Sequence, residues 1–300
     1  MLIEDIHVID NDWNSSIYPV VPGHEIIGRV AEGSGSSKHP IGSIVGVGPQ
    51  VYSCGSCTNC QADKDPLCSK RVFTYSDKFI DGSITYGGYA RQVLVNEEYA
   101  IEIPDGMDLS RAAPLLCAGA TVFSPLRCIP KNSSVGIVGI GGLGHLAVQF
   151  SRALGHRVSA ISHSPRKERE AKDLGAESFI LIDKLENFAL SFNYLLVTSS
   201  HGLESIDGLL STLKFDGSLT LVALPAKQIG FTPSLLVSFN RKIMSSLILG
   251  KKGMTEMLSF AHSHSIYPTI EEFGIDKVNE AIEKVRKGTI RYRAVLTVHN

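Results

Sequence analysis

The sequence has little of what membrane, secreted and nucleic-acid-binding proteins need. No apolar run reaches the roughly 18 residues of a membrane-spanning helix. The net charge of the 300-residue chain is −1, so it lacks the basic excess that binds nucleic acid or an acidic membrane surface. The first residues, Met-Leu-Ile-Glu-Asp, contain neither a basic segment nor an apolar stretch, and we therefore expect no secretory signal. Repeats and low-complexity tracts are missing as well, and the length suffices for two domains.

Cysteine is scarce, at six residues, and most of it lies in one short loop. The loop holds Cys54, Cys57, Cys60 and Cys68. Zinc in a structural site takes four ligands at tetrahedral corners, and successive C-x-x-C turns present thiolates to one ion. The alternative, free or disulfide-bonded thiols, would suit a secreted protein better. We therefore expect a structural zinc in this loop. Because only Cys117 and Cys128 lie elsewhere, we also expect a reducing, cytoplasmic location.

Residues 20–103 form a pattern of short strands separated by turns. Apolar and β-branched runs at 26–31, 44–47 and 89–95 predict strands, and glycine and proline between them predict turns. This pattern is typical of an irregular β domain. A helix is expected to begin after a capping Asp108 or Ser110, where an Ala/Leu-rich stretch follows.

From Ser134 the pattern becomes strand, turn, helix and strand, which is typical of βαβ units in a parallel sheet. The later elements expected here are a helix at 145–154, strands at 157–161, 194–198 and 218–223, and a helix near 203–213. A helix at 276–287 and a strand at 292–298 are expected near the C-terminus. The fold class is therefore α/β.

The first connection between strand and helix carries a glycine-rich motif, made of Gly139, Gly141, Gly142, Leu143 and Gly144. Gly139 permits a tight turn, Gly141 lets a pyrophosphate approach the backbone, and Gly144 lets the helix pack closely on the strand. Amides at the helix start and the positive end of its dipole then bind the phosphates. The motif predicts dinucleotide binding, and a plain tight turn is the alternative.

The next strand ends without the acidic residue that binds the ribose 2′-hydroxyl in NAD sites, about 20 residues beyond the glycines. In its place stand Ser162, His163, Ser164, Arg166 and Lys167. A carboxylate would repel a 2′-phosphate, whereas hydroxyls and cations bind it. We therefore expect NADP(H). The alternative is a solvated helix start that happens to be basic.

Two more residues are candidates for chemistry but carry little weight alone. His24 follows Pro22-Gly23 just before an expected strand, and Cys117 lies within the stretch 114–121. A lone histidine is most often a satisfied surface or core residue, and a buried cysteine most often serves packing.

In combination, the motifs occur in an order that resembles one family. They are V-P-G-H-E-I-I-G (21–28), the four-cysteine loop, G-G-Y-A (87–90), A-P-L-L-C-A-G-A-T (113–121) and G-I-G-G-L-G-H (139–145), with R-Y-R at 291–293. The chain resembles the zinc-dependent medium-chain alcohol dehydrogenases, in particular the cinnamyl-alcohol dehydrogenase-like branch that uses NADP(H). The resemblance covers essentially the whole chain. It implies a GroES-like irregular β catalytic domain at 1–118 and 251–300, and a doubly wound Rossmann domain at 119–250.

The resemblance also implies roles for the residues of a catalytic site. His24 and Cys117 would bind a catalytic zinc, and Glu25 would be a carboxylate able to approach the metal. Asp5 would orient the imidazole of His24. His7 would form the far end of a proton relay.

The activity implied by the resemblance is the interconversion of primary aromatic or aliphatic alcohols and aldehydes. Zinc would act as a Lewis acid, and NADP(H) would carry the hydride. Trp13 would line the substrate pocket, although a core aromatic is an equal alternative, and Thr121 would contact the cofactor. The expected partners are a small-molecule alcohol or aldehyde and a second copy of the chain, bound through the edge of the Rossmann sheet.

Several positions depart from the family pattern. Leu2 stands where the first zinc-ligating cysteine is usual, and Glu4 stands where a Ser or Thr hydroxyl passes on the substrate proton. The strands that normally precede Asp5 are absent, as expected of a late start codon, a truncated gene or a deliberately shortened chain. His163 replaces a usual serine beside the 2′-phosphate, but imidazole also donates to phosphate.

Three functions follow as alternatives. The first is an NADP(H)-dependent zinc alcohol dehydrogenase, fully active only if residues upstream of Met1 exist in the cell. The second is a catalytically impaired remnant that still binds zinc and NADP(H). The third is a zinc-independent reductase of the same superfamily, which the set of His24, Glu25 and Cys117 disfavours. We expect the first.

Overall fold

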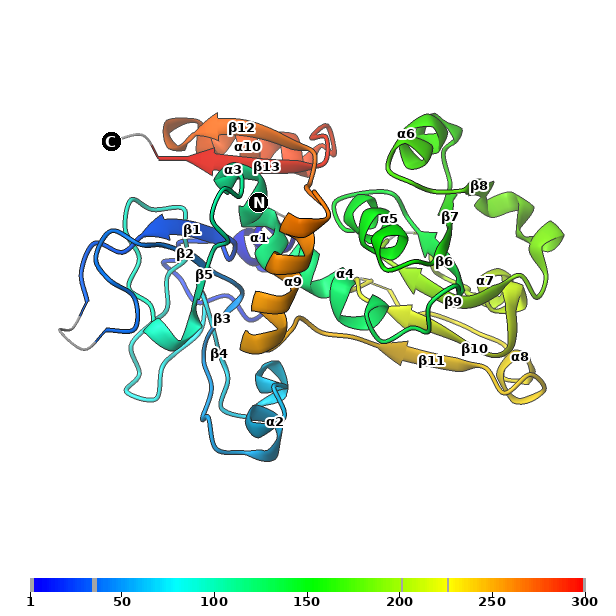
Figure 1. Ribbon diagram of the computed structural model, residues 1–300, viewed down its shortest axis with the longest axis horizontal. Helices are drawn as coiled ribbons and strands as arrows, with labels where there is room; N and C mark the ends of the chain where they lie inside the picture. The colour runs from blue at the N-terminus through cyan, green and yellow to red at the C-terminus, as the bar shows by residue number, and fades with distance from the viewer. Residues whose placement is uncertain (1–2, 34–36, 201, 226, 299–300) are drawn as a thin grey trace. The chain divides into compact units, whose positions relative to one another are not determined.

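Figure 1 shows the computed structural model, which describes residues 3–33, 37–200, 202–225 and 227–298. The chain forms two compact units, one of Met1–Ala120 with Ile248–Asn300 and one of Thr121–Leu247. The first unit is therefore built from both ends of the chain. Within the described residues, no helix is both long and apolar enough to traverse a lipid bilayer.

The first unit contains short, irregular β-sheets and helices (Figure 1). Its main sheet is antiparallel in the order β1-β2-β5, whereas β3 pairs with β4 and β12 lies parallel to β13. The strands are β1 (Ile26–Arg29), β2 (Ile44–Val47), β3 (Gln50–Tyr52), β4 (Val72–Phe73), β5 (Ala100–Glu102), β12 (Ile270–Gly274) and β13 (Arg293–Thr297). The α-helices are α1 (Ile3–Asp10), α2 (Thr58–Gln61), α3 (Leu109–Ala112), α9 (Lys251–Ser263) and α10 (Val278–Arg286). Short 3₁₀ turns occur at Asp65–Leu67, Glu97–Tyr99, Ala113–Leu116 and Ile275–Lys277.

The second unit is built on a six-stranded parallel sheet in the order β11-β10-β9-β6-β7-β8. The strands are β6 (Ser134–Val138), β7 (Arg157–Ser162), β8 (Ser178–Leu181), β9 (Phe192–Val197), β10 (Leu213–Leu221) and β11 (Lys242–Ser245). The helices are α5 (Gly144–Ala153), α6 (Glu168–Asp173), α7 (Asp207–Thr212) and α8 (Ser234–Val237), with 3₁₀ turns at Pro165–Lys167 and Ile182–Phe188. Helix α4 (Ala118–Leu126) carries the chain into this unit.

The strand order reverses next to β6. The chain runs from β6 through β7 to β8 on one side, and then from β9 through β10 to β11 on the other. Such a doubly wound sheet binds ligands outside the carboxyl ends of its strands, at the switch point between β6 and β9. The central strand β9 contains three consecutive buried residues, Leu195, Leu196 and Val197. Because consecutive strand residues point to opposite faces, both faces of the sheet are covered, and this explains the continuous apolar run.

The structure confirms most elements predicted from the sequence, with one clear error. Asp108 caps α3, because its Oδ1 accepts the backbone N–H of Arg111 at 3.2 Å. The strand predicted at 89–95 is wrong. The N–H of Tyr89 instead donates to the carbonyl of Pro22 at 3.0 Å. The segment therefore begins with a hydrogen bond to a loop and not with the hydrogen-bond ladder of a β-sheet. Four elements are also shorter than predicted: α7 begins only at Asp207, β1 ends at Arg29, and both α10 and β13 fall short of their predicted ends.

Candidate functional site

The four cysteines of the loop form a compact cluster. Their Sγ atoms are 3.9 Å apart for Cys54 and Cys60, 3.4 Å for Cys57 and Cys60, and 3.6 Å for Cys68 and Cys54. A tetrahedral zinc with Zn–S bonds of about 2.3 Å places its sulfurs about 3.8 Å apart, so the cluster fits one zinc. All four cysteines are free thiols, which excludes the disulfide alternative. Hydrogen bonds from the backbone of Ser56 and Cys57 lower the pKa of Cys54 to about 6, which favours the thiolate that zinc requires.

The cysteine loop also anchors a helix from the far end of the chain. Asp63 accepts the backbone N–H of Lys252 at 3.0 Å and that of Gly253 at 2.9 Å, and Asp65 accepts that of Lys251 at 3.4 Å. The amides at the start of a helix have no acceptor within the helix itself. The N-cap residue of α9, Gly250, has no side chain that could accept them. The carboxylates of the loop therefore act as the cap of α9.

A second cluster of metal-ligand atoms comes from residues far apart in the sequence. The ligand atoms of His24, Glu25 and Cys117 all lie within 4.8 Å of one another. His24 and Glu25 directly precede β1, after a turn in which Gly23 has a φ of +103°. A Cβ at Gly23 would lie 2.5 Å from the Tyr89 ring, so the turn needs glycine.

Asp5 fixes the orientation of the His24 imidazole by binding its Nδ1 atom. Its Oδ1 lies 2.9 Å from Nδ1 of His24, and the hydroxyls of Tyr75 and Tyr89 donate to the same carboxylate at 2.9 Å each. Gly23 adds a backbone N–H at 3.2 Å. With Nδ1–H donating to Asp5, Nε2 is the atom free to bind a metal.

The charges around the cluster suit a cation. Burial lowers the pKa of His24, but the negative charges of Asp5 and Cys117 outweigh burial and hold that pKa well above its usual value. Burial raises the pKa of Cys117, which the positive charge of His24 partly offsets. A dication would displace both protons, because a coordinating thiol is deprotonated outright and a ligating imidazole is neutral. The donor set of one imidazole nitrogen and one thiolate therefore fits zinc.

Arg293 also belongs to the site, although its sequence context indicates no role for it. Its side chain is fully buried and its Nη2 pairs with Oε2 of Glu25, whose Oε1 accepts the N–H of Ala118 at 3.4 Å. The R-Y-R motif at 291–293 singles out this region of the sequence. The neighbouring residues do not indicate that Arg293 pairs with a residue 268 positions away. The pair neutralises Glu25 at the edge of the cluster.

Helix α1 and the residues that follow it hold the predicted relay residue His7 and the predicted pocket residue Trp13. His7 places Nδ1 2.6 Å from Oδ2 of Asp12, and its ring centroid is 5.2 Å from that of Trp13. Trp13 is 42% exposed, so the alternative of a core aromatic is wrong. Leu2 lies outside the described residues.

The glycine motif lies at the switch point of the parallel sheet. A Cβ at Gly144 would lie 1.8 Å from the carbonyl oxygen of Gly139, and one at Gly139 would lie 2.8 Å from the Ser199 side chain. Both positions therefore need glycine. A Cβ at Gly141 would meet nothing within 4 Å, so the backbone there is open to a ligand. Leu143 is the buried N-cap residue of α5, and the helix starts at Gly144. This cradle fits a pyrophosphate.

The residues expected to bind a 2′-phosphate gather at the end of β7. Ser162 is buried, His163 is exposed beside Gly202, and Ser164 caps the following 3₁₀ turn by accepting the N–H of Arg166 at 3.4 Å. Lys167 lies 3.9 Å from the carboxylate of Glu170. The structure thus places these side chains together, although their partners differ.

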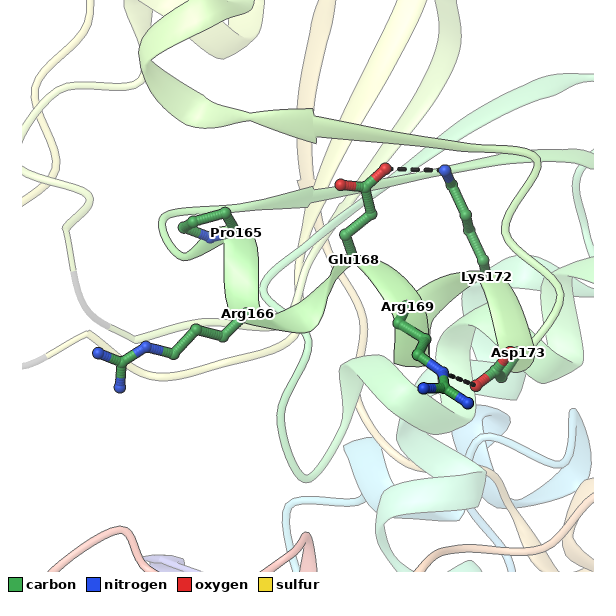
Figure 2. Close-up of a pocket in the computed structure, with 6 residues that line it drawn as sticks. All are labelled: Pro165, Arg166, Glu168, Arg169, Lys172 and Asp173. Atoms are coloured by element: carbon green, nitrogen blue, oxygen red, sulfur yellow. Dashed lines mark hydrogen bonds and ion pairs between the residues drawn. The ribbon is translucent and has the colours of Figure 1, made fainter.

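Figure 2 shows that Arg166 differs from the other charged residues around it. Glu168 pairs with Lys172 at 2.7 Å and Arg169 with Asp173 at 3.9 Å, both along α6. Arg166 instead extends away from the helix, and no ion pair holds its guanidinium within the described residues. It is therefore free to meet an anionic ligand. The remaining predicted contact, Thr121, is a buried residue of α4.

Two family models match the sequence. The model described as "Alcohol dehydrogenase GroES-like domain" matches residues 3–105, and the one described as "Zinc-binding dehydrogenase" matches residues 142–263. These matches confirm the expected fold class, a GroES-like domain combined with a Rossmann-type domain.

Similar proteins cover nearly the whole chain. A probable mannitol dehydrogenase of Fragaria ananassa is 41% identical over 99% of this chain and 84% of the relative, and a probable cinnamyl alcohol dehydrogenase of Arabidopsis thaliana is 39% identical over the same shares. A solved cinnamyl alcohol dehydrogenase from Sorghum bicolor has a TM-score of 0.92 at 35% identity, over 99% of this chain and 86% of that one. The cinnamyl alcohol dehydrogenase of Helicobacter pylori, solved in complex with NADP(H), has a TM-score of 0.89 at 33% identity, over 99% and 87%.

The matched regions cover 99% of this chain and therefore include both units. The chain belongs to the zinc-dependent medium-chain alcohol dehydrogenases, which are oxidoreductases, and within them it is similar to the cinnamyl alcohol and mannitol dehydrogenases.

Proposed function

We propose that this chain is an NADP(H)-dependent zinc alcohol dehydrogenase that interconverts primary alcohols and aldehydes, either aromatic or aliphatic. The observation that carries the proposal is the juxtaposition of the buried His24 and the partly buried Cys117, with Asp5 2.9 Å from the imidazole. The names of the relatives, mannitol and cinnamyl alcohol dehydrogenases, support this range of substrates. They also favour an enzyme over a remnant.

The proposed domains are 1–118 with 251–300 for catalysis and 119–250 for the cofactor. The two compact units of the fold support this division. A structural zinc is proposed in the loop 54–68, on the four-thiol cluster. We also propose a homodimer formed through the edge of the parallel sheet, which would double the chain mass of 32.4 kDa in light scattering.

The proposed catalytic roles follow from the contacts of each side chain. Bound zinc would act as a Lewis acid on the substrate oxygen, while the bound cofactor would carry the hydride. His24 and Cys117 would hold the metal, and the bond from Nδ1 to Asp5 keeps Nε2 turned toward it. His24 is buried and Cys117 partly buried, which limits access of water to the metal. Arg293 balances the charge of Glu25 beside them.

Other proposed contacts lie outside this cluster. His7 is proposed as the far end of a proton relay, because its pair with the exposed Asp12 brings it to solvent. Trp13 is proposed as a wall of the substrate pocket and Thr121 as a cofactor contact. The glycine cradle and the free guanidinium of Arg166 support NADP(H), as does the NADP(H) complex of the Helicobacter pylori relative.

The test is NADPH oxidation with cinnamaldehyde or benzaldehyde, followed by absorbance. The intact chain should turn over, and Cys117→Ser should be slower by about 100-fold or more, because it loses a metal ligand. Cys128→Ser, an exposed thiol outside both clusters, is the matched control. Equal rates for the intact chain and Cys117→Ser would contradict the proposed site. A chain that binds zinc and NADPH but does not turn over would be the remnant.

A further inference from the structure

The G-G-Y-A motif at 87–90 lies directly against the turn that carries His24. Three consecutive backbone N–H groups of the motif donate to carbonyls of that turn: Gly87 to Val21 at 2.7 Å, Gly88 to Gly23 at 2.8 Å and Tyr89 to Pro22 at 3.0 Å. A Cβ at Gly87 would lie 2.5 Å from the carbonyl oxygens of both Pro22 and Gly23, so a side chain there would push the two segments apart. The glycines of the motif therefore permit close contact between two backbone segments.

The tyrosine of the motif extends this contact to α1 and to the C-terminal strands. Its ring covers Gly23, and its hydroxyl donates to Oδ2 of Asp5 at 2.9 Å. The side chain also packs against an apolar cluster formed by Phe273 of β12, Ala281 of α10 and Ala294 of β13. Tyr89 thus connects the helix that carries Asp5 with the turn that carries His24, and it is itself held by a third part of the same unit.

The two oxygens of the buried Asp5 carboxylate bind different donors. Oδ1 lies 2.9 Å from Nδ1 of His24 and also accepts the hydroxyl of Tyr75 and the N–H of Gly23, whereas Oδ2 accepts the hydroxyl of Tyr89. The torsion that sets the plane of a carboxylate has only broad preferences, so donors at one oxygen alone leave that plane free to turn. A phenol donates at neutral pH, because its pKa is about 10. The bond from Tyr89 therefore fixes the plane in which Oδ1 meets the imidazole.

We propose that Tyr89 is a positioning residue of the catalytic metal site: by binding Oδ2 of Asp5, it fixes the orientation in which His24 presents Nε2 to zinc. Groups that bind the far nitrogen of a metal-ligating histidine contribute about 10–100-fold to metal affinity. Tyr89 acts through such a group, one hydrogen bond further from the metal, so its contribution is smaller. The inference rests on the proposed metal site, and it gives the G-G-Y-A motif a function in that site.

The experiment removes the hydroxyl alone and measures zinc by competition with a chelator. Tyr89→Phe keeps the ring over Gly23 and should weaken zinc at the catalytic cluster by about three- to tenfold, whereas zinc in the cysteine loop should bind as before. The matched control is Tyr194→Phe, which removes a buried hydroxyl that bonds to Thr220 in the other unit. It should leave both zinc affinities unchanged. An equal loss in the two variants would overturn the inference.

A second measurement separates positioning from a general loss of stability. The proton on Nδ1 of His24 donates to a buried carboxylate and should give a downfield NMR resonance, identified by its absence in His24→Gln. Tyr89→Phe should shift this resonance or lose it to exchange with water, and Tyr194→Phe should not. Adding Tyr89→Phe to Asp5→Asn should weaken zinc by less than about twofold further, because both changes act on one contact. Fully additive losses, or an unmoved resonance, would contradict a role through Asp5.

Cys117→Ser separates failure of this inference from failure of the proposed site. If Cys117→Ser loses one zinc while Tyr89→Phe binds both as tightly as the intact chain, the site exists and Tyr89 does not position it. If Cys117→Ser keeps two zinc ions, the proposed catalytic metal site itself is wrong. Zinc in the cysteine loop and tight NADPH binding verify for each variant that both units are folded.

Discussion

The Nδ1 atom of His24 lies 2.9 Å from Oδ1 of Asp5, and both side chains are buried. Two tyrosine hydroxyls and one backbone N–H donate to the same carboxylate, so Asp5 cannot turn away from the imidazole without losing several hydrogen bonds. The direction of the imidazole is therefore determined by α1, the helix at the start of the chain.

Asp5→Asn should weaken zinc at the catalytic cluster by about 10–100-fold, because the imidazole loses its charged partner and its fixed tautomer. Chelator competition measures the affinity. The matched control is Asp12→Asn, which removes the carboxylate next to the other histidine of this region, His7, at an exposed position. Equal losses in the two variants would show that general charge, and not the contact with His24, determines the affinity.

Arg166→Ala should raise the Kd for NADPH about tenfold and change the Kd for NADH little, because only NADPH has a 2′-phosphate for the free guanidinium. Arg169→Ala removes an arginine of the same segment that pairs with Asp173, and it should affect neither cofactor. Lys167→Ala should have a smaller effect than Arg166→Ala, since Lys167 lies near Glu170. Fluorescence titration gives all three results, and equal NADPH and NADH affinities in the intact chain would contradict the NADP(H) preference.

Cys57→Ser should release one zinc and lower the stability of the first unit by a few kcal/mol, on the order of 5–10 °C in Tm. The effect should reach α9, because Asp63 caps that helix from the same loop. Hydrogen exchange of the amides of Lys252 and Gly253 measures this coupling. Unchanged protection of these amides in the metal-free variant would contradict it.

His156 should make the second unit less stable in acid. Burial lowers its pKa below 6.5, while the carbonyl of Leu126 partly opposes this. The unfolded chain therefore takes up a proton that the folded chain does not, so the stability contribution is present above about pH 6.5 and is lost as the pH falls below it. His156→Gln should unfold with a smaller drop in urea midpoint between pH 7.5 and 5.5 than the intact chain. His163→Gln, at an exposed position, should retain the full drop.

The sequence was sufficient wherever a function needs residues close together in the chain. Cysteine spacing in the loop 54–68 and the glycines of 139–144 are local patterns, and the structure places both as predicted. The strand pattern at 89–95 was misleading, because alternation of apolar residues does not reveal that Tyr89 reaches Asp5 with its hydroxyl. Tertiary contact prevailed over local pattern there.

The rest of the site depends on contacts across the whole length of the chain. Arg293 reaches Glu25 from the last strand, and its burial is visible only once β13 is in place. Glu4 appeared only as a departure from a hydroxyl position, and its unpartnered oxygen is a property of the folded protein. The types of residue in the site could therefore be predicted from the sequence. The burial and orientation of single polar atoms could not.

The capping of α9 by Asp63 also affects the order in which the two units can fold during translation. The cysteine loop is synthesised early, but the amides of Lys252 and Gly253 that it holds emerge only after all of the parallel-sheet unit, Thr121–Leu247, has been made. During translation, the unit in the middle of the sequence can thus finish folding first, and the unit that was begun first is the last to close. A nascent chain that stalls before residue 253 leaves the cysteine loop without its helix.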